Sequence, residues 1–543
     1  MATMTINTVQ TDLARSPYPS QRSPVTAPCG VVATSQPLAA QAGLSMLQNG
    51  GNAVDAALAA AIALTVVEPT SNGIGGDAFA IVWDGKQLHG LNGSGRSPAA
   101  ATVDALRLAG HQTIPALGWW SVTVPGVPRA WADLHAKCGR LPFATLFGPA
   151  ITYARFGYPV SPVISGLWAG GFNRYSALDG PEFRPWMDTF APGGRAPLPG
   201  EHWSSAAHAA TLEKIAASGA RDVYEGDLAR QIAQFAARTG GHMTADDLAA
   251  HTSTWVDPIS GRYRGYDVWE IPPNGQGIAS LVGLQILDGL DVAAHPRESV
   301  ESYHLQIEAL KLGLADAQRY VADMDHEDVP VRGLLDSAYA AERRALIGER
   351  AVDPTPGTPV RGGTVYLCAA DADGMMVSYI QSNYQGFGSG VVVPETGIAL
   401  QNRGYGFVTE AGHPNRLAPN KRPFHTIIPA FLTRDGEPVG PFGVMGGFMQ
   451  AQGHLQMAVN TLDYGMNPQA SLDAPRWRWD GGRTVAIEPG VPEEVAEGLR
   501  ARGHEIVREG GGGYGRGQII WRLPGGGYVA GSEPRADGCA AAY

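Results

Sequence analysis

A threonine preceded by two glycines stands at the start of a strand-like stretch in the last third of the chain. Gly362-Gly363-Thr364 leads into an apolar run that ends at Asp371. A threonine hydroxyl becomes a useful nucleophile when the threonine's own α-amine acts as the base, which requires this residue to be the first of a chain. The pKa of a free α-amine is ~8, so the amine can accept the hydroxyl proton near neutral pH. The pattern predicts a precursor that cuts itself between Gly363 and Thr364, the alternative being a loop that merely enters a hairpin.

The residues on either side of this threonine fit that prediction. Residues 364–371 and 375–382 are both strand-like, and Asp371-Ala-Asp-Gly374 between them is a turn sequence. Residues 350–363 contain three prolines and three glycines, a composition that disfavours regular structure and suits a tail that moves away after cleavage. We therefore predict a β-hairpin that begins at the nucleophile.

Two other stretches give predictions of local structure. Residues 36–67 predict two helices separated by Asn49-Gly50-Gly51-Asn52, with Asn52 as the N-cap of the second helix. Residues 161–203 are rich in Gly, Pro and Trp and show little periodicity. We interpret this second stretch as an ordered surface excursion or as a lid over the site.

The composition indicates an acidic globular protein and argues against several partners. The chain has 40 Lys and Arg residues and 51 Asp and Glu residues, a formal charge of −11. No basic run is present, so we expect no nucleic-acid partner, because phosphate binding requires clustered Lys or Arg. No cluster has the spacing of metal ligands and no phosphate loop occurs, so we expect neither a metal nor a cofactor.

The cysteines and the N-terminal residues indicate a cytoplasmic protein. The four cysteines are widely spaced and form no CxxC pair, as in a reducing compartment. Residues 1–28 are rich in Ser, Thr and Pro and lack the apolar segment of a signal peptide. Residues 53–67 are strongly apolar but fall short of the ~20 residues that span a bilayer, so no membrane association is expected.

Ordered glycine- and proline-containing motifs extend along nearly the whole chain. They include Gly50-Gly-Asn-Ala-Val-Asp-Ala-Ala57, Gly73-Ile-Gly-Gly76, Gly386-Phe-Gly-Ser-Gly390, Pro419-Asn-Lys-Arg-Pro423 and Ser532-Glu-Pro-Arg535. In this order and spacing the chain resembles the γ-glutamyltransferase family of N-terminal-nucleophile hydrolases. Gly93-Ser-Gly-Arg-Ser-Pro98 and His425-Thr-Ile-Ile-Pro429 are most similar to the branch that includes oxamate amidohydrolase.

The resemblance implies a fold and a division of the chain. The fold is α+β, a four-layer αββα sandwich built by two subunits from one self-cleaved precursor. Residues 1–28 would form an N-terminal arm, residues 29–363 the large subunit, and residues 364–543 the small subunit with Thr364 at its N-terminus. The two fragments would form a heterodimer, and such heterodimers could pair further. Length alone would instead suggest three or four domains.

The resemblance also implies the catalytic groups. Thr364 would perform both self-cleavage and enzymatic attack, and a second hydroxyl on the return strand falls at Ser382. Adjacent strands bring such side chains within about 5 Å, although Ser382 would also suit an ordinary strand position. The family's oxyanion hole corresponds to Gly446-Gly447, whose backbone N–H groups would bind the developing negative charge.

The substrate-binding positions differ from those of glutamyl-specific members. The Asp and Gln that hold the α-amino group of glutamate correspond to Gly406 and Arg403, and a strand Asn corresponds to Tyr384. A pair of serines corresponds to His425 and Thr426. An Arg of the first hairpin has no counterpart at the same position. Ser94 stands there, and Arg96 lies two residues further on.

These differences favour an acidic amide as the substrate. Loss of the carboxylate at Gly406 removes the partner of an α-ammonium group, whereas Arg403 could form bidentate hydrogen bonds to a carboxylate. We therefore predict hydrolysis of a small carboxylate-bearing amide such as oxamate. Three alternatives stay open: Arg403 forms a structural ion pair, His425 is a buried structural histidine, or the enzyme acts on γ-glutamyl compounds such as glutathione. An uncleaved, catalytically silent binding protein is the interpretation from another functional class.

Overall fold

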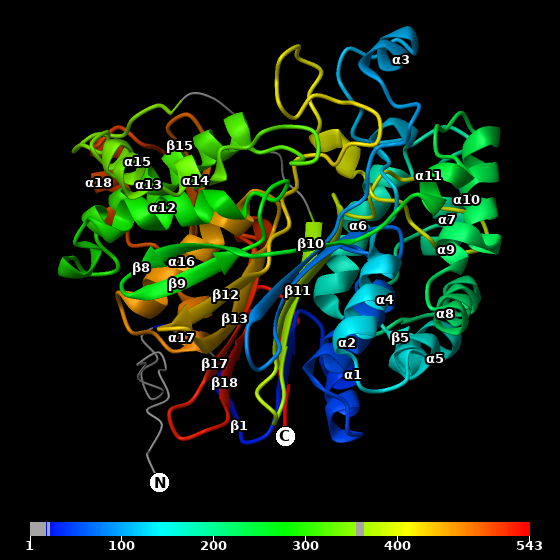
Figure 1. Cartoon of the computed structure of the whole chain (residues 1–543), viewed down its shortest axis with the longest axis horizontal. Helices are drawn as coiled ribbons and strands as arrows, with labels where there is room; N and C mark the ends of the chain where they lie inside the picture. The colour runs from blue at the N-terminus through cyan, green and yellow to red at the C-terminus, as the bar shows by residue number, and fades with distance from the viewer. Residues whose placement is uncertain (1–17, 19–21, 355–362) are drawn as a thin grey trace.

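Two seven-stranded antiparallel sheets pack face to face at the centre of the protein, and helices cover the outer face of each sheet (Figure 1). This is the predicted four-layer αββα sandwich. The computed structural model describes Tyr18, residues 22–354 and residues 363–543. The predicted tail residues 355–362 lie outside the described part of the chain, as does most of the predicted N-terminal arm.

The first sheet, which we call the β10 sheet, contains the predicted hairpin at its centre. The hairpin strands are β10 (Gly363–Ala370) and β11 (Met376–Tyr384), joined by the predicted turn. The sheet order is β19 (Cys539–Ala542), β2 (Val31–Thr34), β10, β11, β3 (Asp77–Trp83), β4 (Leu88–Gly93) and β7 (Thr254–Val256).

The second sheet, which we call the β13 sheet, also combines strands from both predicted subunits. Its edge strand β1 lies inside the predicted N-terminal arm and pairs with β18. The order is β1 (Val25–Ala27), β18 (Tyr528–Ser532), β17 (Arg516–Arg522), β13 (Glu437–Met445), β12 (Ala430–Arg434), β9 (Tyr266–Glu270) and β8 (Ile259–Tyr263). Because both sheets combine strands from before and after Thr364, the two segments share one core.

The two sheets approach each other closely near the start of the hairpin. A side chain at Gly443 of β13 would place its Cβ 2.5 Å from the ring of Tyr366 on β10. Glycine at this position therefore makes room for a buried tyrosine between the sheets. Such contacts hold the strand that begins at the predicted nucleophile against the opposite sheet.

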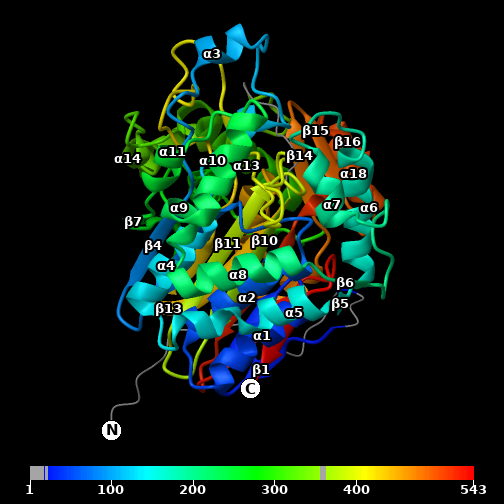
Figure 2. The same ribbon diagram turned by 90° about the vertical axis from the view of Figure 1, so that its right-hand side faces the viewer.

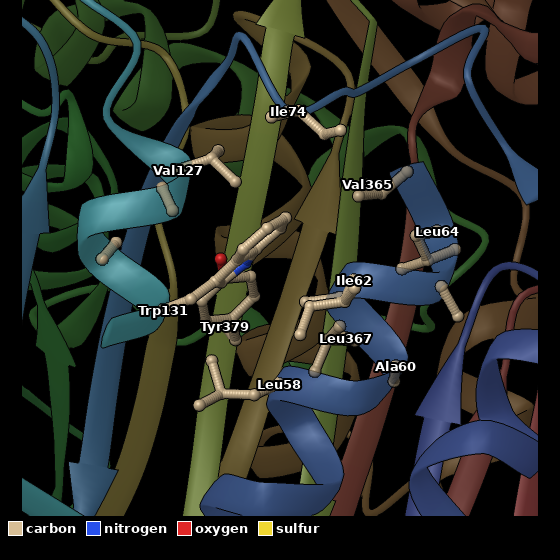
Figure 3. Close-up of a cluster of buried hydrophobic side chains, with 14 of the residues drawn as sticks. Leu58, Ala60, Ile62, Leu64, Ile74, Val127, Trp131, Val365, Leu367 and Tyr379 are labelled. Atoms are coloured by element: carbon tan, nitrogen blue, oxygen red, sulfur yellow. The ribbon is translucent and has the colours of Figure 1, made fainter. Parts of the chain in front are cut away.

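The helices outside the β10 sheet include the two predicted from residues 36–67. These are α1 (Pro37–Gln48) and α2 (Ala53–Val67), and Asn52 caps α2 as expected. The helix α2 is buried along its whole length. In Figure 3, Ile62 and Leu64 lie near Leu367 and Val365 of β10, and Leu58 lies beside Tyr379 of β11. The same layer contains α4 (Val127–Cys138), α5 (Gly148–Phe156) and α8 (Ala206–Ser218), which lie across β10 and β11 in Figure 2.

Helices on the opposite side cover the β13 sheet (Figure 1). They are α12 (Gly277–Asp288), α13 (Val300–Tyr320), α16 (Met449–Leu462) and α17 (Pro468–Asp473). No helix in the described chain is both long and apolar enough to cross a membrane. Further elements are α3 (Val103–Leu108), β5 (Tyr158–Pro159), β6 (His202–Trp203), α9 (Asp222–Glu225), α10 (Asp227–Arg238), α11 (Ala245–Ala249), α14 (Val331–Leu334), α15 (Ser337–Arg344), β14 (Trp477–Gly481), β15 (Thr484–Ile487), α18 (Glu493–Ala501) and β16 (Glu505–Arg508).

Residues 161–203 are more regular than their composition predicted. They form α6 (Pro162–Tyr175) and α7 (Arg184–Phe190). The rings of Trp168 and Trp186 lie 5.7 Å and 5.2 Å from the ring of Phe387, which explains the tryptophan content of this stretch. Tertiary packing of these aromatic rings supports helices that the sequence periodicity did not reveal.

Candidate active site

The hydroxyl of Thr364 lies between two polar side chains from different elements. Its Oγ1 donates to Oγ of Ser382 over 3.2 Å, and Nε2 of Gln450 donates to the same Oγ1 over 3.3 Å. The backbone N–H of Tyr384 donates to Oγ of Ser382 over 2.7 Å, which fixes this second hydroxyl. Thr364 and Ser382 are both buried. The structure thus brings together the two predicted hydroxyls.

A bulge on β11 lies opposite the threonine, where Ser382 and Asn383 face the single residue Thr364. Gly363 is paired with Tyr384, whereas Val365 is paired with Gln381, and the register shifts between these two pairs. Bulges bend a strand and re-aim the side chain of the extra residue. The bulge therefore places the bond between Gly363 and Thr364 at an irregular point of an otherwise regular strand.

Gly446 and Gly447 connect the end of β13 to the beginning of α16. Their φ angles of 129° and 64° lie in the region that glycine tolerates and other residues avoid. Gly446 lines the same cavity as Thr364. The carbonyl of Gly447 accepts a hydrogen bond from Nε2 of Gln276 over 2.9 Å, and this bond stabilises the conformation of the turn. The N–H groups near the start of a 14-residue helix are suited to binding an anion.

A cavity of about 290 Å³, which we call the Thr364 cavity, opens beside the nucleophile. Its walls come from α6, from the loop after β11 and from the turn before β17. They include Arg174, Phe387, Gly446 and Arg516. The stretch predicted as an excursion or lid thus contributes α6 to the wall of this cavity.

Arg403 lies buried beneath an aromatic ring, and its guanidinium is only partly satisfied. Its Nη1 donates to Oγ1 of Thr426 over 2.8 Å, and its guanidinium carbon is 3.9 Å from the ring centre of Tyr384. Within the described chain, Nε and Nη2 have no hydrogen-bond partner. Burial lowers the pKa of Arg403 to about 10, so the side chain remains cationic at neutral pH. An unpaired buried cation of this kind is costly and is suited to an anionic ligand.

Tyr384 separates Arg403 from a second cavity of about 540 Å³, which we call the Tyr384 cavity. Gly406 and Phe424 also line this cavity. A side chain at Gly406 would place its Cβ 3.0 Å from the carbonyl oxygen of Phe424. Glycine at position 406 therefore lets the backbone lie close to the carbonyl of Phe424 at the wall of this cavity.

His425 is a buried, hydrogen-bonded histidine in this structure. Its Nε2 is 3.0 Å from Oδ2 of Asp77, and its Nδ1 accepts from the N–H of Ile427 over 3.3 Å. Nδ1 acts as an acceptor, which leaves the ring proton on Nε2, where it donates to Asp77. Burial and the nearby Arg403 hold the pKa of His425 well below its usual value. This geometry matches the structural alternative for His425 better than direct contact with a substrate.

The side chains of Ser94 and Arg96 are each bound to another residue of the protein. Oγ of Ser94 donates to Oδ1 of Asn92 over 2.7 Å and is fully buried. Nη2 of Arg96 forms an ion pair with Asp325 at 2.6 Å, and the Asp325 side chain is 59% exposed. The Arg96 guanidinium is therefore engaged near the surface, and Arg403 is the better-placed cation.

Two side chains at the site were not identified from the sequence. Gln450 reaches Thr364 from the first turn of α16, three residues after Gly447. Asp77 is opposite Ser382 in the β-ladder and accepts from the N–H of Gly95 over 2.8 Å. Burial raises the pKa of Asp77 to about 7. The sequence did contain a signal for Asp77, because this residue directly follows the motif Gly73-Ile-Gly-Gly76 and is the first residue of β3.

A separate buried cluster contains His304 and Glu308 of α13 together with His504, which directly precedes β16, and their ligand-type atoms lie within 4.8 Å of one another. Nζ of Lys311 donates to Glu308 over 2.7 Å and already provides a positive charge there. Nδ1 of His304 and Nε2 of His504 are 2.8 Å apart, as in a hydrogen bond. Lys311 and Glu308 also bind the backbone of Val352, so the cluster forms a hydrogen-bonded network that already contains its own cation.

The family model described as gamma-glutamyltranspeptidase matches residues 39–543, and the chain belongs to this family. The glutathione hydrolase-like YwrD proenzyme of Bacillus subtilis is 38% identical over 520 residues, which cover 93% of this chain and 96% of that protein. The oxamate amidohydrolase proenzyme of Klebsiella pneumoniae is 33% identical over 529 residues, which cover 95% of this chain and 98% of that protein.

Among solved structures, a cephalosporin acylase from Bacillus halodurans superposes with a TM-score of 0.94 at 54% identity. The match covers 98% of this chain and 99% of that chain. These findings confirm the predicted family and its N-terminal-nucleophile hydrolase fold. The curated relatives named above are proenzymes, and their names cover more than one kind of amide substrate.

Proposed function

We propose that the protein is a self-cleaving amidohydrolase that uses Thr364 as an N-terminal nucleophile and acts on amides whose acyl group carries a carboxylate. The observation that supports this most directly is the placement of the Thr364 hydroxyl between Ser382 and Gln450, next to Gly446. Ser382 accepts a hydrogen bond that orients the hydroxyl of Thr364, and the glycine N–H groups can bind an oxyanion.

Self-cleavage would use the same hydroxyl as catalysis. Oγ1 of Thr364 attacks the carbonyl carbon of Gly363, and the bond from that carbon to the nitrogen of Thr364 breaks. This exchange leaves an ester between the two residues and a free α-amine on Thr364. Water then hydrolyses the ester, which releases the carboxyl group of Gly363 and restores the hydroxyl. In later turnovers the α-amine can accept the hydroxyl proton, and the acyl-enzyme is hydrolysed in the same way.

Cleavage would also change the surroundings of Arg403. Gly363 is the backbone partner of Tyr384, and the Tyr384 ring lies on the guanidinium of Arg403. Departure of Gly363 removes one constraint on Tyr384, which can then turn away and give a carboxylate access to Arg403. The two free nitrogens of Arg403 match the two oxygens of a carboxylate. In this way, self-cleavage would expose Arg403 to the carboxylate of the substrate's acyl group.

The volume of the Tyr384 cavity indicates how large the acyl group of the substrate can be. Oxamate is a very small amide, whereas the Tyr384 cavity has a volume of about 540 Å³. A longer carboxyacyl amide is therefore a second candidate, favoured by this volume and by the 54% identity to a protein described as a cephalosporin acylase. A γ-glutamyl substrate is less well supported, because Gly406 offers no carboxylate for an α-ammonium group.

A panel of substrates with the purified protein tests this proposal. We expect two fragments by intact-mass measurement, and hydrolysis of oxamate or of oxalyl, succinyl or glutaryl p-nitroanilides. Acetyl and γ-glutamyl p-nitroanilides are the comparison compounds, since the first lacks the carboxylate and the second adds an α-ammonium group. A clear preference for either comparison compound, or an uncleaved chain, would contradict the proposal.

A further inference from the structure

Two arginine side chains line the Thr364 cavity, and no aspartate or glutamate is among the described residues that line it. Arg174 comes from the last turn of α6, and Arg516 is the first residue of β17. The mechanism proposed above does not use either residue. A small cavity that touches the nucleophile and contains two guanidinium groups has the charge expected of a binding site for an anion.

The backbone fixes Arg516 beside the oxyanion glycine. Arg516 is paired with Met445 on β13, and Gly446 follows Met445 directly. Gly515, just before it, has a φ angle of 74°, and a Cβ there would lie 2.6 Å from the carbonyl oxygen of Met445. A close backbone approach thus holds the arginine at the wall of the cavity, where its side chain remains 9% exposed.

The guanidinium of Arg516 is weakly engaged by the protein itself. Nη1 lies 3.7 Å from Oε1 of Glu68, which is too far for a hydrogen bond, and no hydrogen bond to other described residues accompanies this contact. The other carboxylate oxygen of Glu68 accepts from Oγ of Ser35 over 2.5 Å. Burial raises the pKa of Glu68 to about 7, so Glu68 only partly neutralises Arg516 near neutral pH. Donors of Arg516 are therefore left for a ligand.

Arg174 adds a second positive charge to the same cavity. Its Nη2 donates to Oε1 of Gln385 over 3.0 Å, an uncharged partner that leaves the positive charge uncompensated. The glycines Gly170, Gly171 and Gly512 also line the cavity, which has a volume of about 290 Å³. The space is sufficient for an amine of about the size of an amino acid.

The position of the two cavities relative to the nucleophile decides which part of a substrate each would hold. Tyr384 lines the Tyr384 cavity, whereas Gly386 and Phe387 line the Thr364 cavity, so residues 384–387 divide the two. If the acyl carboxylate binds Arg403 beneath Tyr384, the leaving amine must lie on the other side of the divide. That side is the Thr364 cavity.

We propose that the Thr364 cavity is a leaving-group subsite in which Arg516, assisted by Arg174, binds an anionic group on the amine half of the amide. The preferred substrates are thus amides that join a carboxyacyl group to an amine bearing its own carboxylate, such as an amino acid. This assignment of the amine half rests on the proposed function, which concerns the acyl half.

Two matched substrates test this subsite, namely the glutaryl amides of 4-aminobenzoate and of 4-aminobenzamide. They have the same acyl group and nearly the same shape, and only the first has a charged leaving amine. For the processed enzyme we expect kcat/KM to be at least tenfold higher for the 4-aminobenzoate amide. Arg516→Gln should reduce this preference at least tenfold, and Arg516→Lys should reduce it less. Arg403→Gln should lower kcat/KM for both substrates and leave their ratio unchanged.

Calorimetric binding of free 4-aminobenzoate and 4-aminobenzamide provides a readout that does not require turnover. We expect only the carboxylate to bind, and Arg516→Gln to weaken its binding at least tenfold. The control Arg500→Gln alters an exposed arginine of α18 that pairs with Glu493, and it should change neither readout. Thermal unfolding of each variant reports whether it is folded, and Arg174→Gln replaces Arg516→Gln if the latter is not.

The outcomes separate the subsite from the proposed function. Hydrolysis with a substrate preference that does not depend on Arg516 would overturn the subsite and leave the proposed function standing. Arg516-dependent binding of 4-aminobenzoate without hydrolysis of any carboxyacyl amide would support the subsite and contradict the proposed function. Equal binding of 4-aminobenzoate and 4-aminobenzamide would also overturn the subsite.

Discussion

The side-chain amide of Gln450 donates to the hydroxyl of Thr364 over 3.3 Å, across 86 positions of the sequence. Its oxygen accepts from the N–H of Ile428 over 2.9 Å, so the amide is held in one orientation. With Gln450 as its donor, the threonine hydroxyl directs its own hydrogen toward Ser382. The relationship joins the β10 sheet to the first turn of α16 at the atom proposed to attack.

Replacement of Gln450 by Met should slow self-cleavage about tenfold, because a lost hydrogen bond of ~1 kcal/mol or slightly more would no longer orient the hydroxyl. A time course of fragment formation after cell-free synthesis measures this rate. Gln452→Met is the matched control, since Gln452 lies on the same helix but bonds to Trp479. Equal rates for the two variants would show that Gln450 has only a structural role.

Thr364→Ala should prevent both self-cleavage and amide hydrolysis, because one hydroxyl is proposed to perform both attacks. Thr364→Ser should retain part of each activity, since serine keeps a hydroxyl and, after cleavage, an α-amine. Intact-mass measurement and an assay with carboxyacyl p-nitroanilides follow the two activities. Two fragments from the alanine variant would rule out Thr364 as the processing group.

Arg403→Gln should lower kcat/KM for carboxyacyl amides by roughly 30-fold, on the order of the ~2 kcal/mol of a charged hydrogen bond. Self-cleavage should continue, because the bond between Gly363 and Thr364 presents no free carboxylate. Arg403→Lys should restore activity only in part, since an ammonium group lacks the planar fork of a guanidinium. Steady-state kinetics with the preferred substrate decide the question, and unchanged kcat/KM would assign Arg403 a structural role.

Glu68 should make the protein less stable as the pH rises toward neutrality. Burial raises the pKa of Glu68 to about 7, above its ordinary value, so the folded state keeps a proton that the unfolded chain has released. The resulting stability is fully present below about pH 4 and is lost as the pH passes 7. The free energy of unfolding should therefore fall by about 1.4 kcal/mol per pH unit between pH 5 and 7 relative to Glu68→Gln.

Urea unfolding of both proteins at several pH values tests this, in the Thr364→Ala background so that the chain unfolds as one polypeptide. The difference between them should level off above pH 8. Parallel pH profiles would mean that Glu68 has an ordinary pKa in the folded protein.

Lys311→Met should destabilise the protein by about 3–5 kcal/mol, because it leaves the buried carboxylate of Glu308 without its charged partner. Urea unfolding in the same background provides the measurement. The double variant Lys311→Met with Glu308→Gln should recover much of this loss, since the uncompensated charge is gone. A single variant as stable as its parent would contradict the assignment of Lys311 as the cation of this cluster.

Local patterns were sufficient to predict several elements around the site. The turn at residues 371–374 and the N-cap at Asn52 depend on neighbours within a few residues, and the hairpin β10–β11 and helix α2 were therefore predicted correctly. Residues 161–203 were not, because α6 and α7 are supported by aromatic packing against Phe387, more than 180 positions away.

The sequence by itself determined the family, the αββα fold and the hairpin that contains Thr364, since these depend on ordered motifs and on local periodicity. Only the tertiary structure decided which polar side chains gather around that threonine. Gln450 contacts Thr364, Asp77 lies opposite Ser382 in the sheet, and Arg516 lines the same cavity as Thr364. These residues come from distant segments, and their positions depend on how the two sheets and α16 pack. The same packing gave the two arginines different environments. Arg403 is buried and has two nitrogens without a partner in the described chain, whereas Arg96 pairs with Asp325. Burial and distance determine which of these two arginines can bind a substrate carboxylate, and the spacing of residues in the sequence does not encode either quantity.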